Sequence, residues 1–295
     1  MDPSTVPKKP VGYIGAGVAA AILLASCAQP GAQQGPAGVA ERLRSLAREG
    51  PIVVAHRGSS HEYPENTLPA FEAGVRERSD VVELDFHATS DGVLVCLHDE
   101  ELDRTTDADQ VLGRKKVRVA ETALSDIRRL DAGRWKAARF AGTPLPTLSE
   151  ALEAFGRRSL IMVERKQGSA SSLLEVLRKL ELVGEVLVQS FDWDWLEEIH
   201  RLEPKLALAA LGKDPLTPEL LERLGKMGVC MAHWDARKLR LEDVGLLKSR
   251  GYLVAVYTID EDIGFIGAAA AGADAITTNR PGRLVELIRD GRLGR

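Results

Sequence analysis

The sequence has few cysteines, no surplus of basic residues and no long apolar run, and each absence narrows the class of protein. Three cysteines in 295 residues are too few for a disulfide-stapled fold, and no cysteine–histidine spacing indicates zinc. Cys96 and Cys230 lie far apart in apolar runs, so we expect buried free thiols. The net charge of −4 argues against a nucleic-acid partner. Hydrophobic residues, at 44%, suffice for the core of an ordinary soluble domain.

The apolar run at 11–25 is too short to cross a membrane comfortably, and Lys8 and Lys9 precede it. It ends in LASC at 24–27, which resembles the signal of a bacterial lipoprotein. The resemblance implies diacylation of Cys27 and anchoring of the exported protein to a cell-envelope membrane, on its periplasmic or extracellular face. A plain secretory signal and a short uncleaved anchor are the alternatives. The expected parts are a signal peptide at 1–26, a flexible tether at 27–39 and a folded domain at 40–295.

Short apolar runs alternate with amphipathic stretches along the folded domain, which predicts a parallel sheet joined by crossover helices. The strand candidates are 52–58, 81–87, 93–99, 160–166, 185–191, 205–211, 228–234, 252–259 and 274–278. Helical patterns lie at 67–78, 147–156, 169–183, 193–202, 217–226, 240–250 and 262–271.

Two strand candidates must pair with each other, because only ATSDG separates 81–87 from 93–99. Five residues cannot form a parallel crossover, so these runs are expected to form an antiparallel hairpin. Eight parallel strands then remain, which predicts an α/β protein with a (β/α)8, or TIM, barrel. An open doubly wound sheet is the weaker alternative, because no glycine-rich phosphate loop follows the first strand. The charged stretch at about 100–146, with a short helix expected at 122–131, is interpreted as an insertion near the catalytic end.

The hairpin carries two acids and a histidine that are costly to bury without partners. With Asp91-Gly92 as a two-residue type I′ turn, Asp85 falls opposite His98. Alternation along the strand then puts Glu83 on the same face as Asp85. These three side chains are therefore expected to gather on one side, unless a longer turn shifts the register.

Neighbouring carboxylates repel each other unless a cation lies between them, and Mg²⁺ or Ca²⁺ takes oxygen ligands of this kind. Glu164, at the catalytic end of another strand, supplies a third acid beside Glu83 and Asp85. Lys166 faces the same way, and a lysine beside a metal favours an anionic substrate such as a phosphate. A plain salt bridge between Glu164 and Lys166 is the alternative.

His56 and Arg57 end the first strand at the same mouth of the barrel. Two histidines there, His56 and His98, are suited to general acid–base catalysis on a phosphate ester. A bound metal, together with Arg57 and Lys166, would offset the charge of the phosphoryl oxygens.

Taken together, the motifs resemble the glycerophosphodiester phosphodiesterases over nearly the whole mature chain. The resemblance implies a barrel enzyme that hydrolyses glycerol-based phosphodiesters to glycerol 3-phosphate and an alcohol, through a cyclic phosphate that water opens. It carries acid–base catalysis over to His56 and His98, and the metal ligands to Glu83, Asp85 and Glu164. The motifs, in the family's order, are AHRG at 55–58, PENT at 64–67, ELD at 83–85, HD at 98–99, VERK at 163–166, QSF at 189–191 and ADAITTNRP at 273–281.

Several positions depart from the family's pattern. Tyr257 replaces a usual Trp and Arg165 a usual aliphatic residue. Asp260 stands at a usual Asn, while Asn279 stands at a usual Asp. Because the metal and histidine positions are kept, these departures bear on substrate preference and on the barrel end. Asn66 is expected to cap the helix from Thr67, although the resemblance also allows it a place beside the metal.

His233 and Trp234 end a strand at the mouth of the barrel, and with Tyr257 they are candidates for contact with the alcohol moiety. Two other functions are weighed. One is a lipoprotein that only binds ligands. The other is a phospholipase C or D that acts on membrane lipids or lyso-phospholipids, for which Trp135 and Phe140 would face the membrane. No feature of the sequence specifies an oligomeric state.

Overall fold

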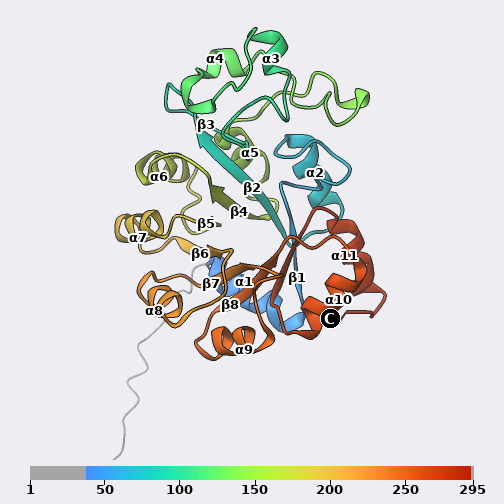
Figure 1. Ribbon diagram of the computed structural model, residues 1–295, viewed down its shortest axis with the longest axis vertical. Helices are drawn as coiled ribbons and strands as arrows, with labels where there is room; N and C mark the ends of the chain where they lie inside the picture. The colour runs from blue at the N-terminus through green and yellow to red at the C-terminus, as the bar shows by residue number, and fades with distance from the viewer. Residues whose placement is uncertain (1–37, 294–295) are drawn as a thin grey trace, which may run out of the picture. The chain divides into compact units, whose positions relative to one another are not determined.

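The computed structural model describes residues 38–293, so the predicted signal peptide and the tether up to residue 37 lie outside the described residues. Within that range, eight parallel strands close into a barrel, because β1 pairs with β2 on one side and with β9 on the other (Figure 1). The (β/α)8 prediction is therefore confirmed. The barrel strands are β1 (Ile52–Ala55), β2 (Val81–Ala88), β4 (Leu160–Arg165), β5 (Val186–Ser190), β6 (Ala207–Gly212), β7 (Met231–Asp235), β8 (Leu253–Tyr257) and β9 (Ala275–Thr278).

Each barrel strand is followed by a helix of the outer ring, and after β2 an insertion with short helices of its own precedes that helix (Figure 1). Residues at the N-termini of these ring helices favour the start of a helix. The helix α5 begins with a capping box between Thr147 and Glu150, and α8 and α11 have proline in the first turn. The helices are α2 (Leu68–Arg76), α5 (Leu148–Phe155), α6 (Ala170–Lys179), α7 (Trp193–Leu202), α8 (Pro218–Lys226), α9 (Leu241–Ser249), α10 (Asp262–Ala270) and α11 (Pro281–Arg289).

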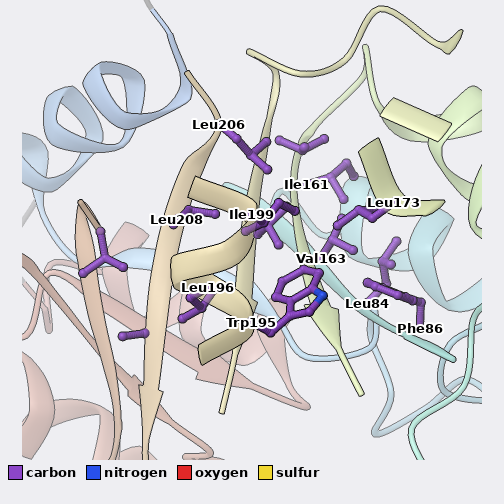
Figure 2. Packing of buried hydrophobic residues seen from close by; sticks show 14 of the residues in the cluster. Leu84, Phe86, Ile161, Val163, Leu173, Trp195, Leu196, Ile199, Leu206 and Leu208 are labelled. Carbon is purple, nitrogen blue, oxygen red and sulfur yellow. The ribbon is translucent and has the colours of Figure 1, made fainter. Parts of the chain in front are cut away.

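Alternation along the strands separates the main core from the inside of the barrel. On β2, Leu84 and Phe86 point outward and pack against the helical layer, together with Val163 of β4 and Leu173 of α6 (Figure 2). The residues between them on β2 therefore point inward, where side chains from several strands meet. This geometry explains why carboxylates occur within an apolar run.

A helix that the sequence did not predict closes the other end of the barrel. In α1 (Val39–Glu49), Val39 and Leu43 are buried against inward residues near the strand starts, among them Ile52 and Leu160. The backbone N–H of Val39 also donates to the carbonyl of Gly184. The last two residues of the expected tether at 27–39, Gly38 and Val39, thus belong to this helix and its N-cap.

The hairpin between β2 and β3 (Leu94–Val95) exists, but its predicted register is wrong by one residue. His87 pairs with Val95, and the backbone N–H of Thr89 donates to the carbonyl of Val93 across a three-residue loop that ends in Gly92 at φ 80°. Asp85 is consequently not opposite His98, and β3 ends three residues before that histidine.

The insertion after β3 has a small core of its own, built from residues such as Leu102, Val117 and Ile127. It extends beyond the carboxyl end of β2 and so lies at the catalytic end (Figure 1). Its short elements are α3 (Ala108–Val111), the 3₁₀ turn η1 (Val119–Glu121), α4 (Leu124–Ile127) and the 3₁₀ turn η2 (Ala138–Phe140). No helix within residues 38–293 has the length and apolar character needed to span a membrane.

Candidate active site

The carboxyl ends of the barrel strands open into a cavity of about 830 Å³. His56, Arg57, His98, Glu164 and Lys166 all line it, although they come from three separate segments of the chain. Glu83 and Asp85 are fully buried and adjoin Glu164. The tertiary structure therefore brings together the seven residues that the sequence analysis assigned to metal, phosphate and proton transfer.

Glu83, Asp85 and Glu164 form a compact acidic cluster. Each offers an oxygen, and these oxygens lie within 4.8 Å of one another. Burial, together with repulsion from Asp85 and Glu164, raises the pKa of Glu83 well above its usual range. Burial and repulsion from Asp85 likewise raise the pKa of Glu164 to about 7. Since Glu83 Oε1 is buried and unpartnered within the described residues, this donor set fits one hard divalent cation.

The turn after β1 fixes the second oxygen of Glu83. Arg57 has φ 55°, a left-handed conformation that is unusual outside glycine, and its backbone N–H donates to Glu83 Oε2 at 2.8 Å. Gly58 follows at φ 80°, where an added Cβ would lie 2.4 Å from the carbonyl carbon of Ala70. The His-Arg-Gly sequence thus has a steric cause: only glycine allows α2 to approach this turn.

Asn66 holds Asp85 from the side. Its Nδ2 donates to Asp85 Oδ2 at 2.8 Å, and its Oδ1 accepts the backbone N–H of Asp85 at 3.0 Å. The expectation that Asn66 caps the following helix is wrong, because α2 begins at Leu68 with Thr67 in the N-cap position. The contact instead places Asn66 beside the acidic cluster, where it orients a carboxylate.

His56 contacts a neutral amide, and a carboxylate holds that amide in turn. Asp260 accepts the Nδ2 of Asn279 at 2.6 Å and the backbone N–H of Asn279 at 2.8 Å. Asn279 must therefore present Oδ1 to His56 Nδ1, at 2.7 Å. The proton of neutral His56 consequently lies on Nδ1, which leaves the lone pair on Nε2. Burial and the nearby Arg57 lower the pKa of His56 to about 4, so the ring is neutral at physiological pH.

His98 contacts a carboxylate directly. Its Nδ1 lies 2.6 Å from Asp99 Oδ1, and Arg104 holds Asp99 while also binding Glu65 at 2.8 Å. His87 donates its Nε2–H to the backbone carbonyl of His98 at 3.1 Å. Burial lowers the pKa of His98, whereas Asp85 and Asp99 act to raise it. The two histidines thus differ in their partners, and the insertion supplies the segment that carries one of them.

The two cations of the site face the same acids. Arg57 Nη1 binds Glu65 at 2.7 Å, and its Nε lies 3.3 Å from Asp85 Oδ2. Lys166 pairs with Glu164 and lies 3.2 Å from Asp85 Oδ1. The salt bridge that the sequence allowed between Glu164 and Lys166 is present, but it belongs to this cluster and lines the cavity. Both cations are therefore placed to meet anionic oxygens of a ligand.

The side chains of the three candidate pocket residues lie in different places. His233 and Tyr257 line the cavity, but both ring nitrogens of His233 are engaged, by Gln189 at 2.7 Å and Thr277 at 2.9 Å. The placement of Trp234 at the pocket is wrong. Its ring points outward into the core, is fully buried, and donates to the carbonyl of Asp214.

Sequence reasoning also missed residues that line or support the site. Phe191, in the QSF motif, lines the cavity with 42% of its surface exposed and packs edge-on to Tyr257. Glu65 and Asp99 were visible in the PENT and HD motifs, but nothing in the local pattern connects them with Arg104. The one sequence signal that Phe191, Glu65 and Asp99 share is that each lies in a motif already assigned to the site.

Two imidazoles with different proton-holding partners, next to an acidic cluster and two cations, are suited to cleavage of a phosphate ester. The fold and the site therefore define a (β/α)8-barrel phosphodiesterase. The chain matches the sequence model of the glycerophosphoryl diester phosphodiesterase family over residues 56–283 and belongs to that family. It is accordingly a glycerophosphodiester phosphodiesterase, a hydrolase whose substrate is a small glycerophosphodiester.

Relatives of known sequence and structure agree with this assignment. The chain is 32% identical to a glycerophosphodiester phosphodiesterase of Bacillus subtilis, over 83% of this chain and 89% of the relative. It is 31% identical to one from Caldanaerobacter subterraneus, over 81% and 98%. A phosphodiesterase from Oleispira antarctica, solved with the product sn-glycerol-3-phosphate, has a TM-score of 0.75 and 27% identity, covering 83% of this chain and 99% of that one. The family typically binds a divalent metal, which agrees with the acidic cluster.

Proposed function

We propose that the protein hydrolyses glycerophosphodiesters to glycerol 3-phosphate and an alcohol with the help of one divalent cation, Mg²⁺ or Ca²⁺. The observation that carries the proposal is the convergence of Glu83, Asp85 and Glu164 within 4.8 Å, beside two histidines in one cavity. These three carboxylates would hold the cation. When bound, it would act as a Lewis acid on the phosphoryl group and lower the cost of negative charge there.

The cationic side chains supply binding and orientation for the phosphate. Arg57 has a rigid fork of donors, and Lys166 has a compact charge close to Asp85. Both would contact the non-bridging oxygens of the diester as negative charge builds on them. The donors are already held in place by Glu65 and Glu164, so little reorganisation is needed when substrate arrives.

The partners of the two histidines support different roles for them in proton transfer. Asn279 holds the proton of His56 on Nδ1, so its Nε2 would accept the proton of the attacking glycerol hydroxyl. Asp99 can stabilise a second proton on His98, so His98 would donate a proton to the leaving alcohol oxygen. The hydroxyl would form a cyclic phosphate, and the same groups in reversed roles would let water open it.

The experiment is glycerol 3-phosphate release from glycerophosphocholine by residues 38–295, with Mg²⁺, with Ca²⁺ and with EDTA. We expect release only with a cation, and a loss of at least about 100-fold in kcat in His56→Ala and Glu83→Ala. Circular dichroism of each variant serves as the folding control. If the folded, metal-loaded protein releases nothing from glycerophosphocholine, glycerophosphoethanolamine or glycerophosphoglycerol, the proposed reaction is wrong.

We further propose that the protein is exported and anchored by lipid on Cys27 to a membrane of the cell envelope. Support comes from Lys8 and Lys9, the apolar run at 11–25 and the LASC sequence, all outside the described residues. Metabolic labelling with a radioactive fatty acid should mark the parent protein and not Cys27→Ser. Equal labelling of both, or a parent protein that remains in the cytoplasm, would contradict the proposal.

A further inference from the structure

One arginine of the insertion reaches back to the active site. Arg104 follows the HD sequence at 98–99 and binds two carboxylates with its guanidinium group. Its Nη1 and Nη2 donate to the two oxygens of Glu65, at 2.9 and 2.8 Å. Its Nε donates to Asp99, and Nη2 also donates to Asp99 Oδ1 at 3.1 Å. Two carboxylates held by one planar fork are fixed in both distance and direction.

Each of these carboxylates also holds a group at the barrel mouth. The oxygen of Glu65 that Arg104 Nη2 contacts also accepts Arg57 Nη1, at 2.7 Å. The oxygen of Asp99 that Nη2 contacts also lies 2.6 Å from His98 Nδ1. One nitrogen therefore joins two halves of an unbroken chain of polar contacts, which runs from Arg57 through Glu65, Arg104 and Asp99 to His98. We call it the Arg104 chain.

Only the two ends of the Arg104 chain line the cavity. Arg57 and His98 belong to its lining, whereas Arg104, Glu65 and Asp99 are not among its lining residues in the described part of the chain. Arg104 is therefore placed to affect a bound ligand through Arg57 and His98, without a contact of its own.

The charge of Arg104 favours the ionised form of both carboxylates. Burial opposes the ionisation of Asp99, but hydrogen bonds from Arg104 and His98 lower its pKa to about 2. Burial likewise acts to raise the pKa of Glu65, yet Arg104 and Arg57 lower it. An ionised carboxylate can only accept, so His98 keeps a proton on Nδ1 and presents Nε2 for proton transfer. Without Arg104, the two acids would repel each other and release their hold on His98 and Arg57.

The core of the insertion fixes the backbone next to Arg104. Leu102 is fully buried in that core, and its backbone N–H donates to the carbonyl of Val117 at 2.9 Å. Asp103 accepts the backbone N–H groups of Lys116 and Val117 at 2.9 and 2.8 Å. Because these contacts directly precede Arg104, the insertion presents the arginine from a fixed position.

We propose that Arg104 is a positioning residue for catalysis, which orients His98 toward the leaving alcohol and Arg57 toward the phosphate. The inference rests on the function proposed above, because that function gives His98 and Arg57 their roles. The shared nitrogen carries the argument, since Arg104 Nη2 contacts the same two oxygens that hold Arg57 and His98. The insertion thus supplies the support for two groups that meet the substrate.

The test compares two esters of glycerol 3-phosphate that differ in their need for an acid. The alcohol of glycerophosphocholine leaves only with a proton, whereas the p-nitrophenyl ester releases nitrophenolate without one. The variants, made in the full chain, are Arg104→Met, Arg104→Lys and the control Arg128→Met. Arg128 lies in the same insertion, has 36% of its side chain exposed against 45% for Arg104, and binds Glu150 at the start of α5 through hydrogen bonds of 2.9 and 2.7 Å.

We expect Arg104→Met to lower kcat/KM at least about 100-fold for glycerophosphocholine and only about tenfold for the nitrophenyl ester. The smaller loss reflects Arg57, and the ratio of the two values, which falls at least about tenfold, reflects His98. Arg104→Lys keeps the charge but lacks the planar fork, so it should lower the ratio about three- to tenfold. Arg128→Met should leave both values within about twofold of the parent.

Circular dichroism shows whether each variant is folded, and Arg104→Lys decides the question if Arg104→Met is not. An unchanged ratio in a folded Arg104 variant would overturn the proposal, as would an equal change in Arg128→Met. If the parent protein hydrolyses both esters and the ratio does not depend on Arg104, only this inference is wrong. If the parent protein hydrolyses neither ester, the proposed function is wrong as well.

Discussion

Replacement of Asp260 by asparagine should reverse the tautomer of His56 although Asp260 does not touch the histidine. In the parent protein Asp260 accepts the Nδ2 of Asn279 at 2.6 Å, so Asn279 has only Oδ1 to offer His56. An asparagine at 260 that keeps its oxygen on Thr278 and on the backbone N–H of Asn279 would place its own NH₂ against that Nδ2. The amide of Asn279 would then rotate and donate to His56 Nδ1, which moves the imidazole proton to Nε2.

The magnitude follows from the hydrogen bonds that the productive tautomer would lose. To return to the form with Nδ1 protonated, Asp260→Asn must leave two partly buried donors facing each other. Because both donors are only partly buried, each should cost about 1–2 kcal/mol, so the penalty is about 2–4 kcal/mol, which corresponds to a decrease in kcat/KM of about 30- to 1000-fold. The change leaves the acidic cluster untouched, so cation affinity should stay within about threefold of the parent value.

The decisive comparison is the exchange of both residues. In Asp260→Asn/Asn279→Asp, a carboxylate at 279 accepts the proton on His56 Nδ1 and the amide at 260 donates to that carboxylate. This is also the arrangement implied by the family's sequence pattern, which the present chain reverses. We expect the double variant to recover kcat/KM to within about tenfold of the parent.

Kinetics with glycerophosphocholine and the long-range ¹⁵N–¹H NMR spectrum of the histidine rings measure the two halves of this prediction. The spectrum should show His56 protonated on Nδ1 in the parent and the double variant, and on Nε2 in Asp260→Asn. Parent-like kcat/KM in Asp260→Asn, or a double variant as impaired as the single one, would refute the tautomer argument. A loss of activity with an unchanged spectrum would mean that Asp260 acts through loop structure alone.

Three further outcomes are expected. Without a divalent cation, the stability of the parent protein relative to Glu164→Gln should fall by about 3 kcal/mol as pH rises from about 5 to 8, because the raised folded-state pKa of Glu164, about 7, favours folding only while that group is protonated. Melting curves of both proteins in EDTA test this, since the comparison cancels the opposite contribution of His56, and a difference that does not change with pH contradicts it. Asn66→Ala should weaken cation binding about 10- to 100-fold in calorimetry, since Asp85 loses its clamp; unchanged affinity would show that the clamp is not needed. Trp234→Ala should cost about 3–5 kcal/mol in urea denaturation with kcat/KM retained, and the opposite pattern would place Trp234 at the substrate.

Local sequence was sufficient for the fold class because the two signals involved are short in range. The period of the apolar residues reports strand or helix, and five residues between two runs exclude a crossover. The helix α1 escaped this reasoning because its sequence VAERLRSLARE follows a stretch interpreted as tether. Only its contact with the open end of the barrel, through Val39 and Leu43, explains why it is part of the domain.

The hairpin register failed for a tertiary reason. Asp91 accepts the hydroxyl of Thr89 and the backbone N–H of Leu124, which lies in the insertion. These contacts favour a three-residue loop over the two-residue turn that Asp-Gly predicts on its own. His98 still reaches the site, but the path of the chain after β3 places it there and strand pairing does not. His98 therefore lines the cavity, but the hairpin register from which its place was predicted is wrong.

His233 and Trp234 are consecutive strand residues, so their side chains point to opposite faces of the strand. Which of the two enters the barrel depends on which way the strand faces. The interval between them is one residue, so one side chain enters the barrel and the other packs in the helical layer. Sequence alone does not show which, since both a histidine and a tryptophan are common in pockets and in cores.

By itself, the sequence determined the barrel, the acidic cluster at Glu83, Asp85 and Glu164, and the place of His56 at the end of the first strand, because strand alternation and chain order constrain them directly. Only the tertiary structure decided that Asn279 meets His56 and which residues line the cavity. The physical reason is distance along the chain: contacts between residues more than two hundred positions apart depend on how all eight strands close. Hydrogen-bond partners and empty space follow from that closure, and no local pattern encodes either.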